Sequence, residues 1–210
     1  MSRDENRAGK FLPTLLLTAV AVTCVVIAGL WLGRTAAQRE ESAIVERPAR
    51  RDFALTDTTG APVSLETYKG KWMLMFFGFT SCPEACPMAL TNVTETLKEL
   101  GADASNLQPV FVSVDPERDT REVVKDYISH FDERIAGLTG TPEAVADMTK
   151  LYGVYYRKRA VDGGDYTIDH STAFYLVSPT GDFLRAFTPD MDPADFARDL
   201  KTAMGKGASS

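Results

Sequence analysis

Two cysteines lie four positions apart in the stretch FFGFTSCPEACPMAL, at Cys82 and Cys86, and each is followed by a proline. The third cysteine of the chain, Cys24, lies in an apolar segment near the N-terminus. A thiol pair of this kind can form a structural disulfide, act as a redox couple or bind a metal ion. The rest of the sequence has to distinguish these three kinds of site.

A structural disulfide is the weakest of the three interpretations. Closing so short a loop stabilises a fold by only about 2 kcal/mol through the entropy of the unfolded chain. A domain of about 150 residues buries a sufficient core without it. A dithiol redox couple is a stronger interpretation, although its usual motif has two residues between the cysteines, whereas this pair encloses Pro83, Glu84 and Ala85.

A metal site needs further ligands besides the two thiolates. Thiolates are soft donors, which favour Cu(I), zinc and iron–sulfur clusters. Because only Cys82 and Cys86 lie outside the apolar segment, a zinc or cluster site built from four cysteines is excluded. A copper site of thiolates and an imidazole remains, since trigonal coordination suits copper.

The chain has two histidines that could supply an imidazole. His130 lies in YISHFDE, near the end of a predicted amphipathic helix, and is typical of an exposed side chain at a helix end. His170 lies in GGDYTIDHSTAFYLV, after a glycine pair, and is predicted to open a strand. Spacing along the chain does not bring His170 to Cys82, so the redox and metal interpretations both stay open.

The elements around the cysteines predict where the pair lies. The apolar run KWMLMFFGF, residues 71–79, is typical of a strand buried on both faces. A helix is predicted to begin at Pro87 and to end before Gly101. Because a proline disfavours helical geometry in the preceding residue, Cys86 is expected in a loop. The pair then lies beyond the carboxyl end of a central strand, where α/β sheets place their sites, and the helix N-terminus favours a thiolate.

The remaining pattern alternates strands with helices. This alternation predicts an α/β sandwich with a mixed central sheet. Further strands are predicted at 53–65 (two short strands around a turn), 107–114, 154–159, 171–177 and 182–187, and further helices at 119–131, 141–153 and 192–204.

Composition and charge narrow the class of protein. The chain has 210 residues, 44% hydrophobic residues and a net charge of −6, which indicates a globular domain and no nucleic-acid binding. Residues 11–33 contain no charged side chain and are long enough to cross a hydrocarbon core of about 30 Å. The apolar part of a cleaved signal peptide is shorter, about 7–15 residues, so we expect an uncleaved transmembrane helix. It follows a short head, residues 1–10, and precedes a linker, residues 34–50, and a globular domain, residues 51–206.

Three stretches together resemble one known family. GFTSCPEACP, VSVDPERDT and DYTIDHSTAFYLVSPTG, in this order, are similar to the Sco/SenC family of copper proteins, which assist assembly of the copper site in cytochrome c oxidase. The resemblance covers about residues 53–200 and the single N-terminal anchor. It implies a thioredoxin-like fold for the sandwich.

The resemblance also implies a ligand set. Matched by position, Cys82, Cys86 and His170 correspond to the family's copper ligands, for Cu(I) and also for Cu(II). Asp115 and Asp119 match the family's aspartate pair in DPERD. Both aspartates can be explained as residues that form the turn before the next helix and cap it. They could also tune the metal site by contacting its ligands without binding the metal themselves.

The implied function is that of a membrane-anchored metallochaperone, which delivers copper to the CuA centre of cytochrome c oxidase. Its expected partners are the copper-bearing subunit of the oxidase and other copper chaperones or thiol reductases. The alternative is an enzyme, a thiol–disulfide reductase that keeps the copper-site cysteines of the oxidase reduced, with Cys82 as nucleophile and Cys86 as resolving thiol. A reductase should tolerate the loss of His170, whereas a copper donor should not. A copper or redox sensor is a third alternative, to which the short head is poorly suited.

The expected location is the bacterial inner membrane, crossed once, with the globular domain facing the periplasm. Basic residues lie on both sides of residues 11–33, so charge does not decide the orientation. The short head argues against a long mitochondrial transit peptide.

Overall fold

The computed structural model describes residues 53–207. The predicted head, anchor and linker, at 1–10, 11–33 and 34–50, lie outside the described residues. Within residues 53–207, no helix combines the length and the apolar character that crossing a bilayer requires. The fold can therefore be compared with the prediction for the globular domain alone.

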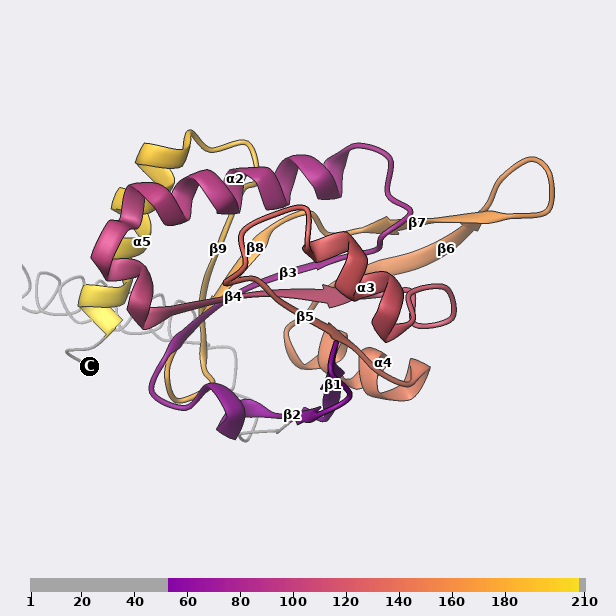
Figure 1. Cartoon of the computed structure of the whole chain (residues 1–210), viewed down its shortest axis with the longest axis horizontal. Helices are drawn as coiled ribbons and strands as arrows, with labels where there is room; N and C mark the ends of the chain where they lie inside the picture. The colour runs from indigo at the N-terminus through magenta and orange to yellow at the C-terminus, as the bar shows by residue number, and fades with distance from the viewer. Residues whose placement is uncertain (1–52, 208–210) are drawn as a thin grey trace, which may run out of the picture. The chain divides into compact units, whose positions relative to one another are not determined.

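A seven-stranded mixed sheet forms the centre of the domain, with strand order β2-β1-β5-β4-β3-β8-β9 (Figure 1). The pairs β3–β4 and β4–β5 are parallel, and β8 and β9 continue the sheet in antiparallel pairing. This confirms the predicted α/β architecture with a mixed sheet. The strands are β1 (Leu55–Asp57), β2 (Pro62–Val63), β3 (Trp72–Gly78), β4 (Leu107–Ser113), β5 (Ala136–Thr139), β8 (Phe174–Val177) and β9 (Phe183–Phe187).

The apolar run predicted as a buried strand is β3, and all seven of its residues are buried. Burial on both faces requires helices on both sides of the strand. In the view of Figure 1, α2 runs above the central strands and α4 lies below them, and α5 lies at the left, where it packs against α2. The strand ends at Gly78, so the residues that follow emerge at the carboxyl edge of the sheet.

The helices begin at the residues that cap them. Thr120 and Thr141 accept hydrogen bonds from the backbone N–H groups of Val123 and Ala144, and Asp192 does the same for Ala194. These caps confirm the predicted starts of the last two helices. The helices are α2 (Ala85–Leu100), α3 (Arg121–Ile128), α4 (Pro142–Leu151) and α5 (Pro193–Gly207), with short 3-10 turns η1 (Leu65–Tyr68) and η2 (Gly101–Asn106).

The prediction that Cys86 lies in a loop is wrong. Helix α2 begins at Ala85, so Cys86 is its second residue and Pro87 its third. The first backbone N–H groups of a helix have no partner within the helix, so a proline in the first turn removes no hydrogen bond. Because no hydrogen bond is lost, Pro87 is accepted in the helix, although a proline disfavours helical geometry in the residue before it, here Cys86.

A second difference concerns His170, which was expected to open a strand. It is instead the last residue of β7 (Tyr166–His170), which pairs with β6 (Tyr156–Ala160) in a separate two-stranded sheet. The next strand, β8, begins only at Phe174. The two strands and their connecting loop project away from the seven-stranded sheet in Figure 1. We call residues 156–170 the hairpin.

Candidate metal centre

The cysteine pair lies where β3 gives way to α2. The backbone N–H of Cys82 donates to the carbonyl of Phe79 at 3.2 Å, which closes a tight turn after the strand. The backbone N–H of Cys86, in the first turn of α2, donates to the sulfur of Cys82 at 3.4 Å. A helix N–H without a partner in the helix thus faces the sulfur, an arrangement that stabilises a thiolate.

Both thiols are buried, but to different extents. Cys82 is 8% exposed and Cys86 is fully buried. Both are free cysteines in this structure. Cys82 is therefore the sulfur that a partner reaches first, and Cys86 lies behind it.

Gly78 makes room for the inner sulfur. A Cβ atom at this position would lie 2.7 Å from the Sγ of Cys86, which is too close, and 3.0 Å from the ring of Phe111, which is a tight contact. A larger residue at the end of β3 would therefore force the sulfur of Cys86 to move. Nothing in the sequence distinguishes this glycine from others at strand ends.

The hairpin brings His170 to the cysteines. Its Nε2 lies 3.6 Å from the Sγ of Cys86, and its Nδ1 lies 2.9 Å from the carbonyl of Ser171. A carbonyl oxygen can only accept, so Nδ1 carries the proton and Nε2 presents its lone pair to the sulfurs. The rings of Phe76 and Phe79 hold the imidazole edge-on, with centroids 6.2 and 5.6 Å away.

Two sulfurs and one imidazole nitrogen thus converge. The ligand atoms of Cys82, Cys86 and His170 all lie within 4.8 Å of one another. In the part of the chain that the structure describes, no other group of three such side chains comes close enough to share a metal ion. His130 is exposed after α3, with its Nδ1 3.3 Å from the carbonyl of Tyr127, as the sequence predicted for a surface histidine.

Hydrogen bonding separates the pKa values of the two thiols. The pKa of Cys82 is lowered from 9.0 to about 4, first because the thiol of Cys86 donates to its sulfur, and also because the backbone N–H groups of Cys86 and Glu84 face it, and together these outweigh the opposite effect of burial. The pKa of Cys86 is raised, because it is the donor to Cys82 and because it is buried. At neutral pH the pair therefore holds one thiolate, on Cys82, and one thiol, on Cys86.

Asp119 lies behind the cysteines and is fully buried. Its carboxylate accepts hydrogen bonds from the backbone N–H and the hydroxyl of Thr80, at 3.0 and 2.6 Å, and from the hydroxyl of Ser113 at 2.6 Å. Thr80 is two residues before Cys82, so Asp119 holds the start of the cysteine loop against β4. The aspartate lies outside the group of three ligand atoms.

Asp115 is also fully buried, and it faces the hairpin. Its carboxylate accepts hydrogen bonds from the hydroxyl of Tyr166 at 2.7 Å and from Nε of Arg118 at 2.5 Å. Tyr166 opens the strand that His170 ends. The two aspartates of DPERD thus contact the two segments that carry the ligand atoms, one aspartate for each segment.

Comparisons with known proteins bear on the segments that carry the cysteines, the aspartate pair and His170. A family model described as SCO1/SenC matches residues 41–205. The chain belongs to the SCO1/SenC family. This confirms the resemblance seen in the sequence, and the three stretches on which it rests carry the cysteines, the aspartate pair and His170.

Relatives within the family agree in sequence and in fold. The chain is 33% identical over 198 residues to the mitochondrial SCO1 homologue of Homo sapiens, covering 89% of this chain and 66% of that protein, just under two thirds. Bradyrhizobium japonicum ScoI, whose structure was solved with copper bound, is 41% identical, with a TM-score of 0.68 over 73% of this chain and 98% of that one. BsSco, described with a disulfide switch and as a member of the Sco family of cytochrome c oxidase assembly proteins, is 27% identical, with a TM-score of 0.59 over 74% and 92%.

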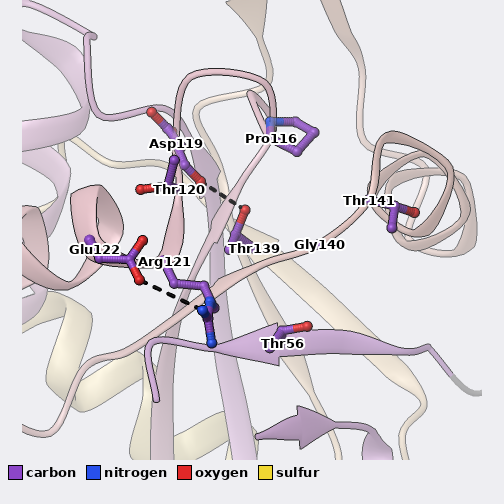
Figure 2. Close-up of a pocket in the computed structure, with 9 residues that line it drawn as sticks. All are labelled: Thr56, Pro116, Asp119, Thr120, Arg121, Glu122, Thr139, Gly140 and Thr141. Carbon is purple, nitrogen blue, oxygen red and sulfur yellow. Dashed lines mark hydrogen bonds and ion pairs between the residues drawn. The ribbon is translucent and has the colours of Figure 1, made fainter. Parts of the chain in front are cut away.

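A cleft of about 300 Å³ opens on another side of Asp119 (Figure 2). Its lining includes Arg121 at the start of α3 and the residues that cap α3 and α4, Thr120 and Thr141, and a hydrogen bond from Thr139 to the Asp119 carbonyl crosses its wall. None of the three ligand side chains lines it. The candidate metal centre is therefore a separate feature, packed between β3, α2 and the hairpin.

Proposed function

We propose that this member of the SCO1/SenC family binds copper through Cys82, Cys86 and His170 and delivers it to the CuA centre of cytochrome c oxidase. The observation that carries the proposal is the convergence of two sulfurs and one imidazole nitrogen within 4.8 Å. Two relatives support it, since Bradyrhizobium japonicum ScoI was solved with copper bound and BsSco is described as belonging to a family of oxidase assembly proteins.

The donor set suits copper as a cargo. Two soft sulfurs favour Cu(I), and an imidazole nitrogen completes a trigonal arrangement. The carbonyl of Ser171 fixes the imidazole tautomer so that Nε2 is the ligating atom, which is how ligating histidines are commonly held. Cu(II) is a second form of the cargo, for which a water molecule would complete the preferred geometry.

The same pair would couple copper binding to redox state. When the pair transfers two electrons to a disulfide of a partner, Cys82 and Cys86 become joined and the partner gains two thiols. Both sulfur ligands are then lost at once, so only the reduced pair binds copper. In an oxidising compartment such a protein needs a thiol reductase as a partner, besides the copper chaperone that loads it.

We also propose the location. Residues 11–33 anchor the chain in the bacterial inner membrane, and residues 34–50 connect the anchor to a domain in the periplasm. The support is the uncharged apolar segment, which has the length of a membrane-spanning helix. The partner is the copper-bearing subunit of the oxidase.

A thiol–disulfide reductase is the second candidate function. The observation that favours it is the difference in burial between the two cysteines, with Cys82 nearer the surface and Cys86 buried behind it. The thiolate of Cys82 would attack a substrate disulfide and release one substrate thiolate. Cys86 would then attack Cys82, releasing the second substrate thiolate, which takes up the proton of Cys86. This reaction does not use His170.

One titration separates the two candidates. The full-length chain, reduced and purified anaerobically in detergent, competes for Cu(I) with a chromogenic chelator. Wild type is compared with Cys82→Ser, Cys86→Ser and His170→Ala, and with Cys24→Ser and His130→Ala as matched controls. We expect one tight site that the first three changes weaken and the controls leave intact. Tight binding that ignores His170, or no tight binding, would reject this ligand set and favour the reductase.

A further inference from the structure

Residues 115–119, the DPERD loop, contact both segments that carry ligand atoms. Asp119 holds Thr80, two residues before Cys82, whereas Asp115 holds Tyr166, at the far end of the strand that carries His170. The contacts of the loop with the hairpin include a side chain that the sequence did not single out, Arg118. We propose that Arg118 is a positioning residue, which holds the hairpin against the domain so that His170 reaches the sulfurs.

Arg118 and Asp115 hold Tyr166 at three points. The hydroxyl of Tyr166 donates to the buried carboxylate of Asp115 at 2.7 Å. Its backbone carbonyl accepts from Nη1 of Arg118 at 2.9 Å. Its ring lies under the guanidinium, with 3.8 Å from the central carbon of Arg118 to the ring centroid. Hydroxyl, carbonyl and ring are thus held together, and the guanidinium donates in turn from Nε to Asp115.

The burial of each contact between the loop and the hairpin determines how much that contact stabilises the position of the hairpin. The carboxylate of Asp115 is fully buried, so separating it from Arg118 would leave a charge in the interior without its cation. The pairs Arg118–Asp165 and Glu117–Lys158 also join the loop to the hairpin, but the side chains of Asp165 and Glu117 are 70% and 58% exposed. Exposed pairs of this kind contribute little. The contact of Arg118 and Asp115 with Tyr166 therefore dominates.

Strand β7 connects the contact at Tyr166 to the proposed metal ligand, His170. Tyr166, Ile168 and His170 alternate along β7 and so lie on one face of it. Ile168 is 4% exposed, which identifies that face as the one packed on the domain. Tyr166 and His170 are separated by about 13 Å at the rise of a strand. Fixing Tyr166 therefore fixes the direction in which His170 points.

The hairpin depends on such a contact because it belongs to no larger sheet. Within the described chain, β6 and β7 pair with each other and with no strand of the seven-stranded sheet. At the other end, the backbone N–H of Ser171 donates to the carbonyl of Tyr155 at 2.9 Å, which closes the root of the hairpin but ties it only to itself. Without Arg118, the hairpin can swing about that root and carry His170 away from Cys86.

Amide hydrogen exchange tests the inference without copper. The full-length reduced chain is compared with Arg118→Ala and Tyr166→Phe, and with Glu117→Gln as a control in the same loop. We expect faster exchange in residues 156–170 of both test variants, with unchanged exchange in 72–78 and 85–100. Tyr166→Phe removes only the hydroxyl that donates to Asp115, so it reports on the Asp115 part of the same contact if Arg118→Ala unfolds the domain. Unchanged exchange in the hairpin of Tyr166→Phe and of a folded Arg118→Ala variant would overturn the inference.

A second measurement addresses copper and rests on the proposed function. In the Cu(I) competition, we expect Arg118→Ala to weaken binding by about 10-fold or more, the usual effect of removing a group that orients a ligand. In a His170→Ala background the same change should have no further effect, because the ligand that it positions is gone. If His170→Ala weakens binding and Arg118→Ala does not, the inference about Arg118 fails and the proposed function stands. If wild type and His170→Ala bind alike, the proposed function fails, and the exchange experiment still decides the role of Arg118.

Discussion

The Nε2 of His170 lies 3.6 Å from the Sγ of Cys86, although the two residues are 84 positions apart in the chain. The contact joins the last residue of the hairpin to the first turn of α2. It leaves the two sulfurs and the nitrogen in a buried corner at the carboxyl edge of β3. The properties of each thiol therefore depend on an element that is remote in sequence, and several measurements follow from this.

The first prediction concerns the charge of Cys82. Its pKa is lowered to about 4, mainly by the hydrogen bond from the thiol of Cys86. A pH titration of the thiolate absorbance of the reduced chain, with Cys24→Ser as background, should give a step near pH 4. Cys86→Ala should move that step upward, because it removes the thiol that donates to Cys82. A thiolate that appears only near the ordinary pKa of cysteine would contradict this assignment of the proton.

The same shift makes stability depend on pH. Between pH 4 and 9 the folded chain holds Cys82 as a thiolate, whereas the unfolded chain, with a pKa near 9.0, holds it as a thiol. Unfolding takes up a proton in this range, so the free energy of unfolding should rise with pH and the contribution should be lost as pH falls toward 4. Denaturant unfolding of reduced wild type and Cys82→Ser should give curves that diverge as pH rises. Parallel curves across this range would argue against the shift.

The strands and helices that could be predicted from sequence are those with a local cause. The apolar run of β3 and the capping residues Thr141 and Asp192 specify their elements without reference to the rest of the chain. Strand β7 was missed because it forms by pairing with β6, and its five residues read as part of a glycine-containing loop. The alternation of Tyr166, Ile168 and His170 was the available signal.

The site was only partly visible in the sequence, for a similar reason. The spacing of Cys82 and Cys86 indicates a thiol pair, but His170 could be joined to it only through the family resemblance. Thr80 and Tyr166 carried no signal, because their partners in the DPERD loop lie 39 and 51 positions away. Contacts of this length depend on the packing of whole elements, which neither spacing nor periodicity encodes.

The next prediction concerns Gly78. A methyl group there would lie 2.7 Å from the Sγ of Cys86 and 3.1 Å from the ring of Phe76, inside a packed core. Gly78→Ala should lower the free energy of unfolding by about 1–3 kcal/mol and weaken Cu(I) binding, because the sulfur must move. Gly205→Ala is the matched control, since a Cβ there meets nothing within 4 Å. Equal stability of the two variants would mean that Cys86 does not need the space.

Asp119 should hold the cysteine loop through its three hydrogen bonds. In Asp119→Asn the side-chain amide can no longer accept all of them, so donors of Thr80 and Ser113 are left buried without partners. The cost is about 1–3 kcal/mol in the free energy of unfolding, and alkylation of Cys82 should become faster as the loop loosens. Glu84→Gln, an exposed change inside the same loop, serves as the control. Denaturant unfolding and timed alkylation of the reduced chain measure both effects, and a stable variant with wild-type alkylation would contradict the role of Asp119.

Copper binding should release a predictable number of protons. Cys82 is already a thiolate at neutral pH, whereas Cys86 keeps its proton, because its pKa is raised by its hydrogen bond to Cys82 and by burial. A ligand must be deprotonated to bind, so loading Cu(I) on both sulfurs should release about one proton per ion at pH 7. The release can be measured in weakly buffered solution with a pH indicator, under anaerobic conditions. Cys86→Ser should release fewer protons than wild type, because the thiol that loses its proton is gone. Release of about two protons by wild type would mean that Cys82 is protonated before copper binds.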